Sequence, residues 1–164
     1  MTKPVAVFTV DLEWPWHATR LPEAWEPIEW ERTKWEYHRY TERLLKQLAR
    51  YQVKARFYVL GHLEANHPDL IERIRSDGHQ IGSHGYWHRR GEHVGDASDQ
   101  KARAVLEKTG PVHGYRSPFW ATTPWPGPCG GVWFRILPLG LLLLFIRRSN
   151  VFYIHPHDLV ISKE

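Results

Sequence analysis

A pair of histidines separated by three residues is the first feature of this chain that suggests chemistry. His84 and His88 stand in the run GSHGYWHR, residues 82–89. Two imidazoles at this spacing can bind one ion, and neutral imidazole is the commonest side chain that binds divalent transition metals. The sequence contains 11 histidines, so the same spacing also fits two unrelated surface histidines.

Polar clusters follow four of the strands that the sequence predicts. They supply carboxylates, imidazoles and a guanidinium: Asp11 with Glu13, His84 with His88, Arg116, and His155. Each cluster alone has an ordinary explanation, such as a helix cap, a surface ion pair or a partly buried histidine. The carboxyl ends of parallel strands lie at one end of a sheet, where sites form in such folds. Together the clusters contain metal ligands, a base, an orienting cation and an acid.

The apolar pattern predicts strands and helices that alternate along the chain. Strands are expected over residues 5–10, 53–60, 79–83, 112–115 and 151–154, and helices over 32–51, 68–76 and 97–109. Pro68 suits the first turn of its helix, and Gly78 ends that helix. This alternation predicts an α/β fold with parallel strands and crossover helices.

Composition limits the size of the protein and its partners. A chain of 164 residues that is 42% hydrophobic can build one core, so we expect a single domain over residues 1–164. The net charge of +4 comes from basic residues mixed with acidic ones, which argues against a nucleic-acid partner. The only cysteine, Cys129, can form no internal disulfide, as is common in a reducing compartment.

The apolar segments bear on location. Too few apolar residues precede Asp11 for the core of a signal peptide, so we expect a cytoplasmic protein. The apolar run at 136–146 is shorter than the roughly 20 residues that span a bilayer. We expect it to form a buried helix. Contact with a membrane surface is the less favoured alternative.

Four motifs resemble those of the polysaccharide deacetylases, the NodB-homology group that forms carbohydrate esterase family 4. They are FTVDLE (8–13), GHQIGSHGYWH (78–88), GYRSPFW (114–120) and VFYIHP (151–156). They occur in the family's order, and their combination is specific. The resemblance implies a distorted (β/α) barrel. Because little chain separates the third motif from the fourth, we expect an incomplete barrel that lacks a segment near 122–130, in a shortened member of the family. Association into a homo-oligomer is one way to complete such a barrel.

Carried over by position, the resemblance implies catalytic roles for three residues. Asp11 matches the general base, Arg116 the residue that orients this base by an ion pair, and His155 the general acid.

The resemblance also implies a metal site. His84 and His88 match two ligands of a divalent ion, which we expect to be zinc, with cobalt or nickel as alternatives. The family's usual third ligand directly follows the base, where this chain has Leu12. We expect Glu13 to replace it, because the two-residue period of a strand turns its side chain to the same side as Asp11. The alternative is that Glu13 is only a polar turn residue.

Residues beside these motifs are candidates for substrate binding: Trp87, Ser117, Pro118 and Trp120. The rings of tryptophans at the rim of a site suit stacking on sugars. The alternative for such tryptophans is that they fill the core of a small protein.

The predicted function is therefore a metal-dependent hydrolase that removes N-acetyl groups from an amino sugar or polysaccharide. A metal with an open coordination position activates water, a carboxylate takes its proton, and an imidazolium protonates the departing amine. The expected partner is an N-acetylated carbohydrate. Two alternatives remain open: hydrolysis of a non-sugar linear amide or ureide, and a non-catalytic remnant that binds metal or glycan.

Overall fold

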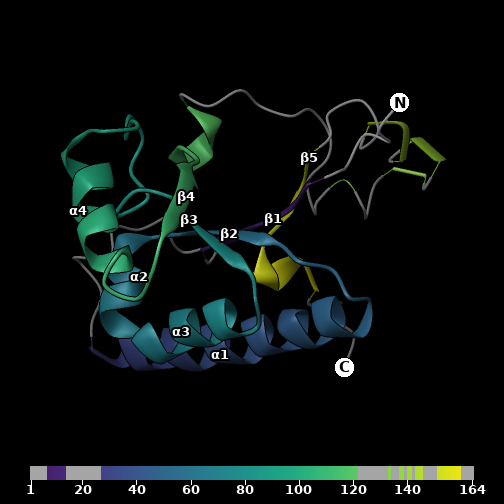
Figure 1. Ribbon diagram of the computed structural model, residues 1–164, viewed down its shortest axis with the longest axis horizontal. Helices are drawn as coiled ribbons and strands as arrows, with labels where there is room; N and C mark the ends of the chain where they lie inside the picture. The colour runs from purple at the N-terminus through teal and green to yellow at the C-terminus, as the bar shows by residue number, and fades with distance from the viewer. Residues whose placement is uncertain are drawn as a thin grey trace.

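The computed structural model describes residues 7–13, 27–121, 133, 137–138, 140–141, 143–145 and 151–159. These residues build a five-stranded sheet in the order β4-β3-β2-β1-β5, with helices packed against it (Figure 1). The strands are β1 (Val7–Leu12), β2 (Arg56–Val59), β3 (Gln80–Ser83), β4 (Val112–Tyr115) and β5 (Val151–Ile154). Every neighbouring pair is parallel. The predicted α/β fold with parallel strands is confirmed.

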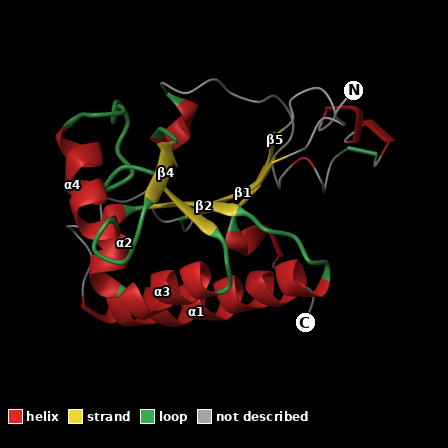
Figure 2. Ribbon diagram, viewed as in Figure 1, coloured by secondary structure: helices red, strands yellow, loops and turns green. Residues whose placement is uncertain are grey.

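Helices cover one face of the sheet. Figure 2 shows α1 (Pro27–Arg50) and α3 (Pro68–Ser76) side by side below the strands, with α2 (Gly61–Asn66) and α4 (Ala97–Leu106) near β3 and β4. Apolar side chains at helical spacing point into the core from α1 and α3: Leu44, Leu45, Leu48, Leu70, Ile71 and Ile74. Apolar stripes of this kind stabilise a helix mainly through burial against the sheet.

Strand β1 separates the core from the site because its side chains alternate between the two faces. Val10 and Leu12 belong to the hydrophobic core. Thr9 and Asp11 point to the other face and are also buried. The first strand of this sheet thus carries polar groups that are shielded from water.

The sequence predicted some boundaries well and others less well. Helix α3 and strands β4 and β5 have the predicted limits. Strand β1 continues to Leu12, because Leu12 pairs with Val59 of β2, so Asp11 lies inside the strand rather than after it. Helix α1 begins at Pro27, before the expected residue 32, and α4 ends at Leu106 rather than at 109. The short helix α2 was not expected.

The prediction of a buried helix at 136–146 is wrong for the leucines that the structure describes. Leu141, Leu143 and Leu144 are 44–48% exposed. Side chains from α1, α2, α3 and α4 fill the core beside the sheet instead, and these leucines lie outside the core cluster. The 3₁₀ helix η5 (Pro156–Leu159) contacts α1 and β1. Among the described residues, no helix has the length and apolar character needed to cross a membrane.

Candidate metal centre and catalytic groups

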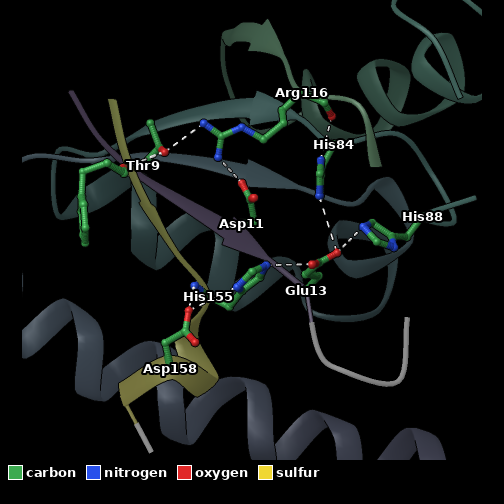
Figure 3. A network of polar contacts seen from close by, with 9 residues as sticks. Thr9, Asp11, Glu13, His84, His88, Arg116, His155 and Asp158 are labelled. Carbon is green, nitrogen blue, oxygen red and sulfur yellow. Dashed lines mark hydrogen bonds and ion pairs between the residues drawn. The ribbon is translucent and has the colours of Figure 1, made fainter. Parts of the chain in front are cut away.

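The carboxyl ends of the strands bring the predicted site residues together (Figure 3). Glu13 directly follows β1, His84 follows β3, Arg116 follows β4 and His155 follows β5. Parallel pairing places these ends at one edge of the sheet. Side chains from segments more than 100 residues apart therefore meet in one cluster.

Glu13, His84 and His88 converge on one point. One ligand atom from each residue lies within 4.8 Å of the other two. The Nε2 atom of His84 is 3.6 Å from Glu13 Oε2, and His88 Nε2 contacts the same oxygen. Both histidines are at least 96% buried. Two imidazoles and one carboxylate form a donor set found in catalytic zinc sites, where a further coordination position stays open.

Local backbone structure turns both imidazoles toward Glu13. The carbonyl oxygen of Arg116 accepts a hydrogen bond from His84 Nδ1 at 2.7 Å, which directs the opposite nitrogen, Nε2, to the site. Hydrogen bonds of this kind orient metal-binding histidines. His88 has a φ of 61°, a left-handed conformation that non-glycine residues rarely adopt. Its ring lies 5.1 Å from the His84 ring, centre to centre.

The charges in this cluster depend on each other. Burial opposes ionisation of Glu13, but hydrogen bonds from His155, His84 and His88 outweigh it and hold the Glu13 pKa well below its ordinary value. Burial likewise opposes protonation of His84, yet Glu13 and the charge of Asp11 raise the pKa of His84. The anionic Glu13 carboxylate thus attracts protons to the imidazoles around it. A divalent cation can bind the same three donors and replace these protons.

Asp11 and Arg116 form a buried ion pair next to the metal candidates. Arg116 Nη1 donates to Asp11 Oδ1, and Nη2 donates to the Thr9 hydroxyl at 2.9 Å. Thr9 in turn donates to the backbone carbonyl of Phe152 at 2.9 Å. Asp11 and Arg116 are 2% and 4% exposed. Because a second nitrogen of the guanidinium is bonded to Thr9, the group is held against the Asp11 carboxylate at two points.

His155 lies between two carboxylates. Its Nε2 is 2.9 Å from Glu13 Oε1, and its Nδ1 is 3.2 Å from Asp158 Oδ2. Burial lowers the His155 pKa, but hydrogen bonds to Asp158 and Glu13 outweigh burial and raise it to about 10. The two carboxylates therefore favour the protonated imidazole, the form that a general acid needs before it donates a proton.

Three contacts at the site were missed by reasoning from the sequence: those of Thr9, of Asp158, and of Tyr58, whose ring centre lies 4.1 Å from Arg116 Cζ. Asp158 accepts the backbone N–H of His155 at 2.8 Å as well as contacting its ring. An acidic residue three positions after a candidate catalytic histidine could have pointed to this contact. The roles of Thr9 and Tyr58 depend on strand register, which the sequence pattern leaves open.

Of the four substrate-binding candidates, Trp120 contacts a residue of the site. Trp87 is half-buried and stacks on His62, with ring centres 5.3 Å apart. Ser117 and Pro118 are buried, so they are less accessible than a substrate contact would require. Trp120 is half-buried and lies over the guanidinium of Arg116. Substrate binding by these residues stays a prediction.

Comparison with known proteins identifies the family. A sequence model described as polysaccharide deacetylase matches residues 30–112, about half of the chain. The chain belongs to the polysaccharide deacetylase family. The resemblance predicted from the motifs is thus confirmed.

Two relatives illustrate how this family member compares with longer proteins. It is 32% identical over 76 residues to the peptidoglycan-N-acetylmuramic acid deacetylase PdaA of Bacillus subtilis. The aligned region covers 43% of this chain and 29% of PdaA. It is 32% identical over 115 residues to a chitin deacetylase of Colletotrichum lindemuthianum. This aligned region covers 62% of this chain and 46% of the relative. The chain therefore matches less than half the length of these curated relatives.

Solved structures show that the fold of this polysaccharide deacetylase family member is shared. A CE4 family pseudoenzyme from Bacillus anthracis has a TM-score of 0.64 and 16% identity, over 94% of this chain and 56% of the other. The peptidoglycan deacetylase PdaC from Bacillus subtilis has a TM-score of 0.59 and 16% identity, over 94% and 77%. The predicted NodB-type fold is confirmed. In the described residues it forms an open sheet with β4 and β5 at its two edges, as an incomplete barrel would have.

Proposed function

We propose that this protein removes N-acetyl groups from an amino sugar or polysaccharide, using a divalent metal held by Glu13, His84 and His88. The observation that carries the proposal is the convergence of these three donors beside the buried Asp11–Arg116 pair. Family membership supports the reaction class, and the named activities of the relatives, on peptidoglycan and chitin, support the substrate class.

A divalent ion in this site would supply a Lewis acid for the amide carbonyl and lower the pKa of a water molecule. Asp11 would accept the proton of the attacking water at its carboxylate. Arg116 fixes the direction of that carboxylate through the ion pair.

His155 would complete the reaction. Hydrolysis of an acetamide releases an amine that must gain a proton to leave. Asp158 and Glu13 raise the pKa of His155, which favours the protonated imidazole that this step needs. Its Nε2 atom points to the same cluster as the metal donors, so we assign the proton transfer to this nitrogen. The Glu13 carboxylate lies between His155 on one side and His84 with His88 on the other, as Figure 3 shows.

The direct test measures acetate released from chito-oligosaccharides and from N-acetylated peptidoglycan, with the protein supplied with zinc, cobalt or nickel. We expect acetate release that stops when a chelator is added. Asp11→Asn should lower turnover at least about 100-fold, as loss of a general base does, while the bound metal is retained. The exposed Asp69 on α3 gives the control Asp69→Asn, which should keep wild-type turnover.

The same assay distinguishes the alternative functions. Release of ammonia or formate from linear amides or ureides, without acetate from any N-acetyl sugar, would assign the protein to non-sugar amides. Bound metal with no hydrolysis of either class would indicate a non-catalytic binding protein.

We infer that residues 1–164 form a single domain and that a segment near 122–130 is missing relative to the family. Residues 122–130 lie outside the described part of the chain. A shortened barrel of this kind supports the prediction of a homo-oligomer, and the cytoplasmic location also stays a prediction. Size-exclusion chromatography with light scattering tests the oligomer directly.

A further inference from the structure

Three aromatic rings surround the guanidinium of Arg116. Its Cζ atom lies 4.1 Å from the ring centre of Tyr58, 4.3 Å from that of Trp120 and 5.7 Å from that of Tyr153. We call Tyr58, Trp120 and Tyr153 the arginine cage. The rings come from β2, the 3₁₀ helix η3 (Pro118–Trp120) and β5, so three separate elements build the cage around one side chain.

The cage and the hydrogen bonds use different parts of the guanidinium. In-plane N–H groups donate to Asp11 and Thr9, whereas aromatic rings interact with the face of the cation. In-plane bonds alone would leave the group free to tilt out of plane. Rings at 4.1 and 4.3 Å prevent this tilt and keep water away from the ion pair.

Strand register explains how Tyr58 reaches Arg116. Tyr58 pairs with Asp11 of β1 on one side and with Gly82 of β3 on the other, so the three positions form one row on the same face of the sheet. A Cβ atom on Gly82 would lie only 2.8 Å from Cδ1 and Cε1 of Tyr58. The ring of Tyr58 therefore fills the space that a side chain at 82 would occupy.

The Tyr58 ring extends across β3 toward β4. A Cβ atom on Gly114 of β4 would lie 3.9 Å from the Tyr58 hydroxyl, and Arg116 follows this strand. The absence of a side chain at Gly82 thus lets an aromatic residue of β2 contact a cation that follows β4. Tyr58 is 8% exposed, so its position is fixed by packing.

The position of Trp120 in the cage depends on unusual backbone. Phe119 and Trp120 have φ values of 55° and 56°, and two consecutive non-glycine residues in the left-handed region are costly. This turn brings Trp120 over Arg116 and within 5.1 Å of the Tyr153 ring. Strain of this kind is retained where the surrounding structure needs the geometry that it gives.

We propose that Tyr58 is a positioning residue, which holds the face of the Arg116 guanidinium and through it directs the Asp11 carboxylate. This role rests on the proposed function of Asp11 as the base. Tyr58 itself does not contact substrate in this account. Its effect passes through one cation, so it depends on the aromatic ring and not on the hydroxyl.

The test compares Tyr58→Leu, which removes the ring, with Tyr58→Phe, which keeps it. For acetate release we expect Tyr58→Leu to lower kcat about 10-fold, with a change in KM below roughly 2-fold and the same bound metal. Tyr58→Phe should stay close to wild type. Loss of activity in the phenylalanine variant equal to that in the leucine variant would overturn a role for the ring.

A second readout does not depend on activity. The Nε–H resonance of Arg116, assigned by its loss in Arg116→Lys, should show the upfield shift that nearby ring faces cause. This shift should decrease in Tyr58→Leu and persist in Tyr58→Phe. If wild type releases no acetate, the proposed function fails while the resonance still tests the cage. If Tyr58→Leu leaves the resonance unchanged, the positioning role is wrong, whatever the activity of the protein.

Discussion

At the level of single residues, Asp158 is the side chain on which the acid role of His155 depends most. Its carboxylate contacts the Nδ1 atom of His155 and accepts the backbone N–H of the same residue. One carboxylate therefore fixes both the ring and the backbone of the proposed acid.

Replacing Asp158 by Asn should lower turnover about 10-fold, because the amide keeps the shape of the side chain but carries no charge to stabilise the imidazolium. Acetate release measures the effect, and metal content should be unchanged. Asp69→Asn on α3 is the matched control. Equal turnover in Asp158→Asn and wild type would remove Asp158 from the mechanism.

The role of Glu13 distinguishes a metal centre from a cluster held together only by ion pairs. Glu13→Gln keeps the size of the side chain and removes its charge. If Glu13 is a ligand, we expect zinc affinity to fall at least about 10-fold in titration calorimetry. Unchanged affinity would mean that Glu13 is only a polar residue after the strand.

At the level of elements, the contact between α2 and α4 depends on a glycine. A Cβ atom on Gly61 would lie 2.6 Å from the Cα atom of Ala102 and 2.6 Å from Cδ2 of Tyr86. The backbone of α4 cannot yield as a flexible side chain can. The missing side chain at Gly61 therefore allows α2 to pack closely against α4 and against Tyr86, which lies two residues before His88.

Gly61→Ala should destabilise the protein by about 1–3 kcal/mol, as overpacking of a core does. The free energy of unfolding in urea checks this value. Gly140→Ala is the control, because a Cβ atom there meets no described atom within 4 Å. The same loss in both variants would show that the close approach of α2 and α4 is not its cause.

Helix α2 also carries a buried histidine that makes stability depend on pH. Burial is the main cause that lowers the His62 pKa from 6.5 to about 4. The charges of His67 and His88 lower it further, and the hydrogen bond to the Tyr86 carbonyl opposes them. Between these pKa values the unfolded chain binds more protons than the folded chain. Stability is therefore lost as the pH falls from 6.5 toward 4.

We expect His62 to contribute a loss of about 2 kcal/mol between about pH 7 and about pH 5. Urea unfolding of wild type and His62→Leu at both pH values, with a chelator present, isolates this contribution. The pH dependence should be smaller in the variant. Parallel curves for the two proteins would mean that another group is responsible.

Sequence alone could predict elements whose pattern is local. Pro68 and Gly78 delimit α3, and the apolar run VFYI marks β5. Helix α2 is too short to show a period, and it starts at a glycine, which normally indicates a turn. The exposed Leu143 shows a further limit, because an apolar run predicts a helix without showing what covers it.

At the level of the whole molecule, the candidate site forms only because four strand ends come together. Residue types and motif order in the sequence predict Asp11, His84, His88, Arg116 and His155 as site residues, since each lies in or shortly after a recognisable strand. The contacts of Thr9, Tyr58 and Asp158 could not be predicted, because they arise from register and from the packing of distant elements.

The central claim is that Glu13, His84 and His88 form one metal centre, and metal bound per chain tests it most directly. Purified wild-type protein, loaded with zinc and dialysed, should retain about one ion per chain by mass spectrometry, as a three-ligand site does. His84→Ala should retain almost none, because it removes one of three converging donors. Wild-type protein without bound metal, or a His84→Ala variant that binds as much as wild type, would contradict the account.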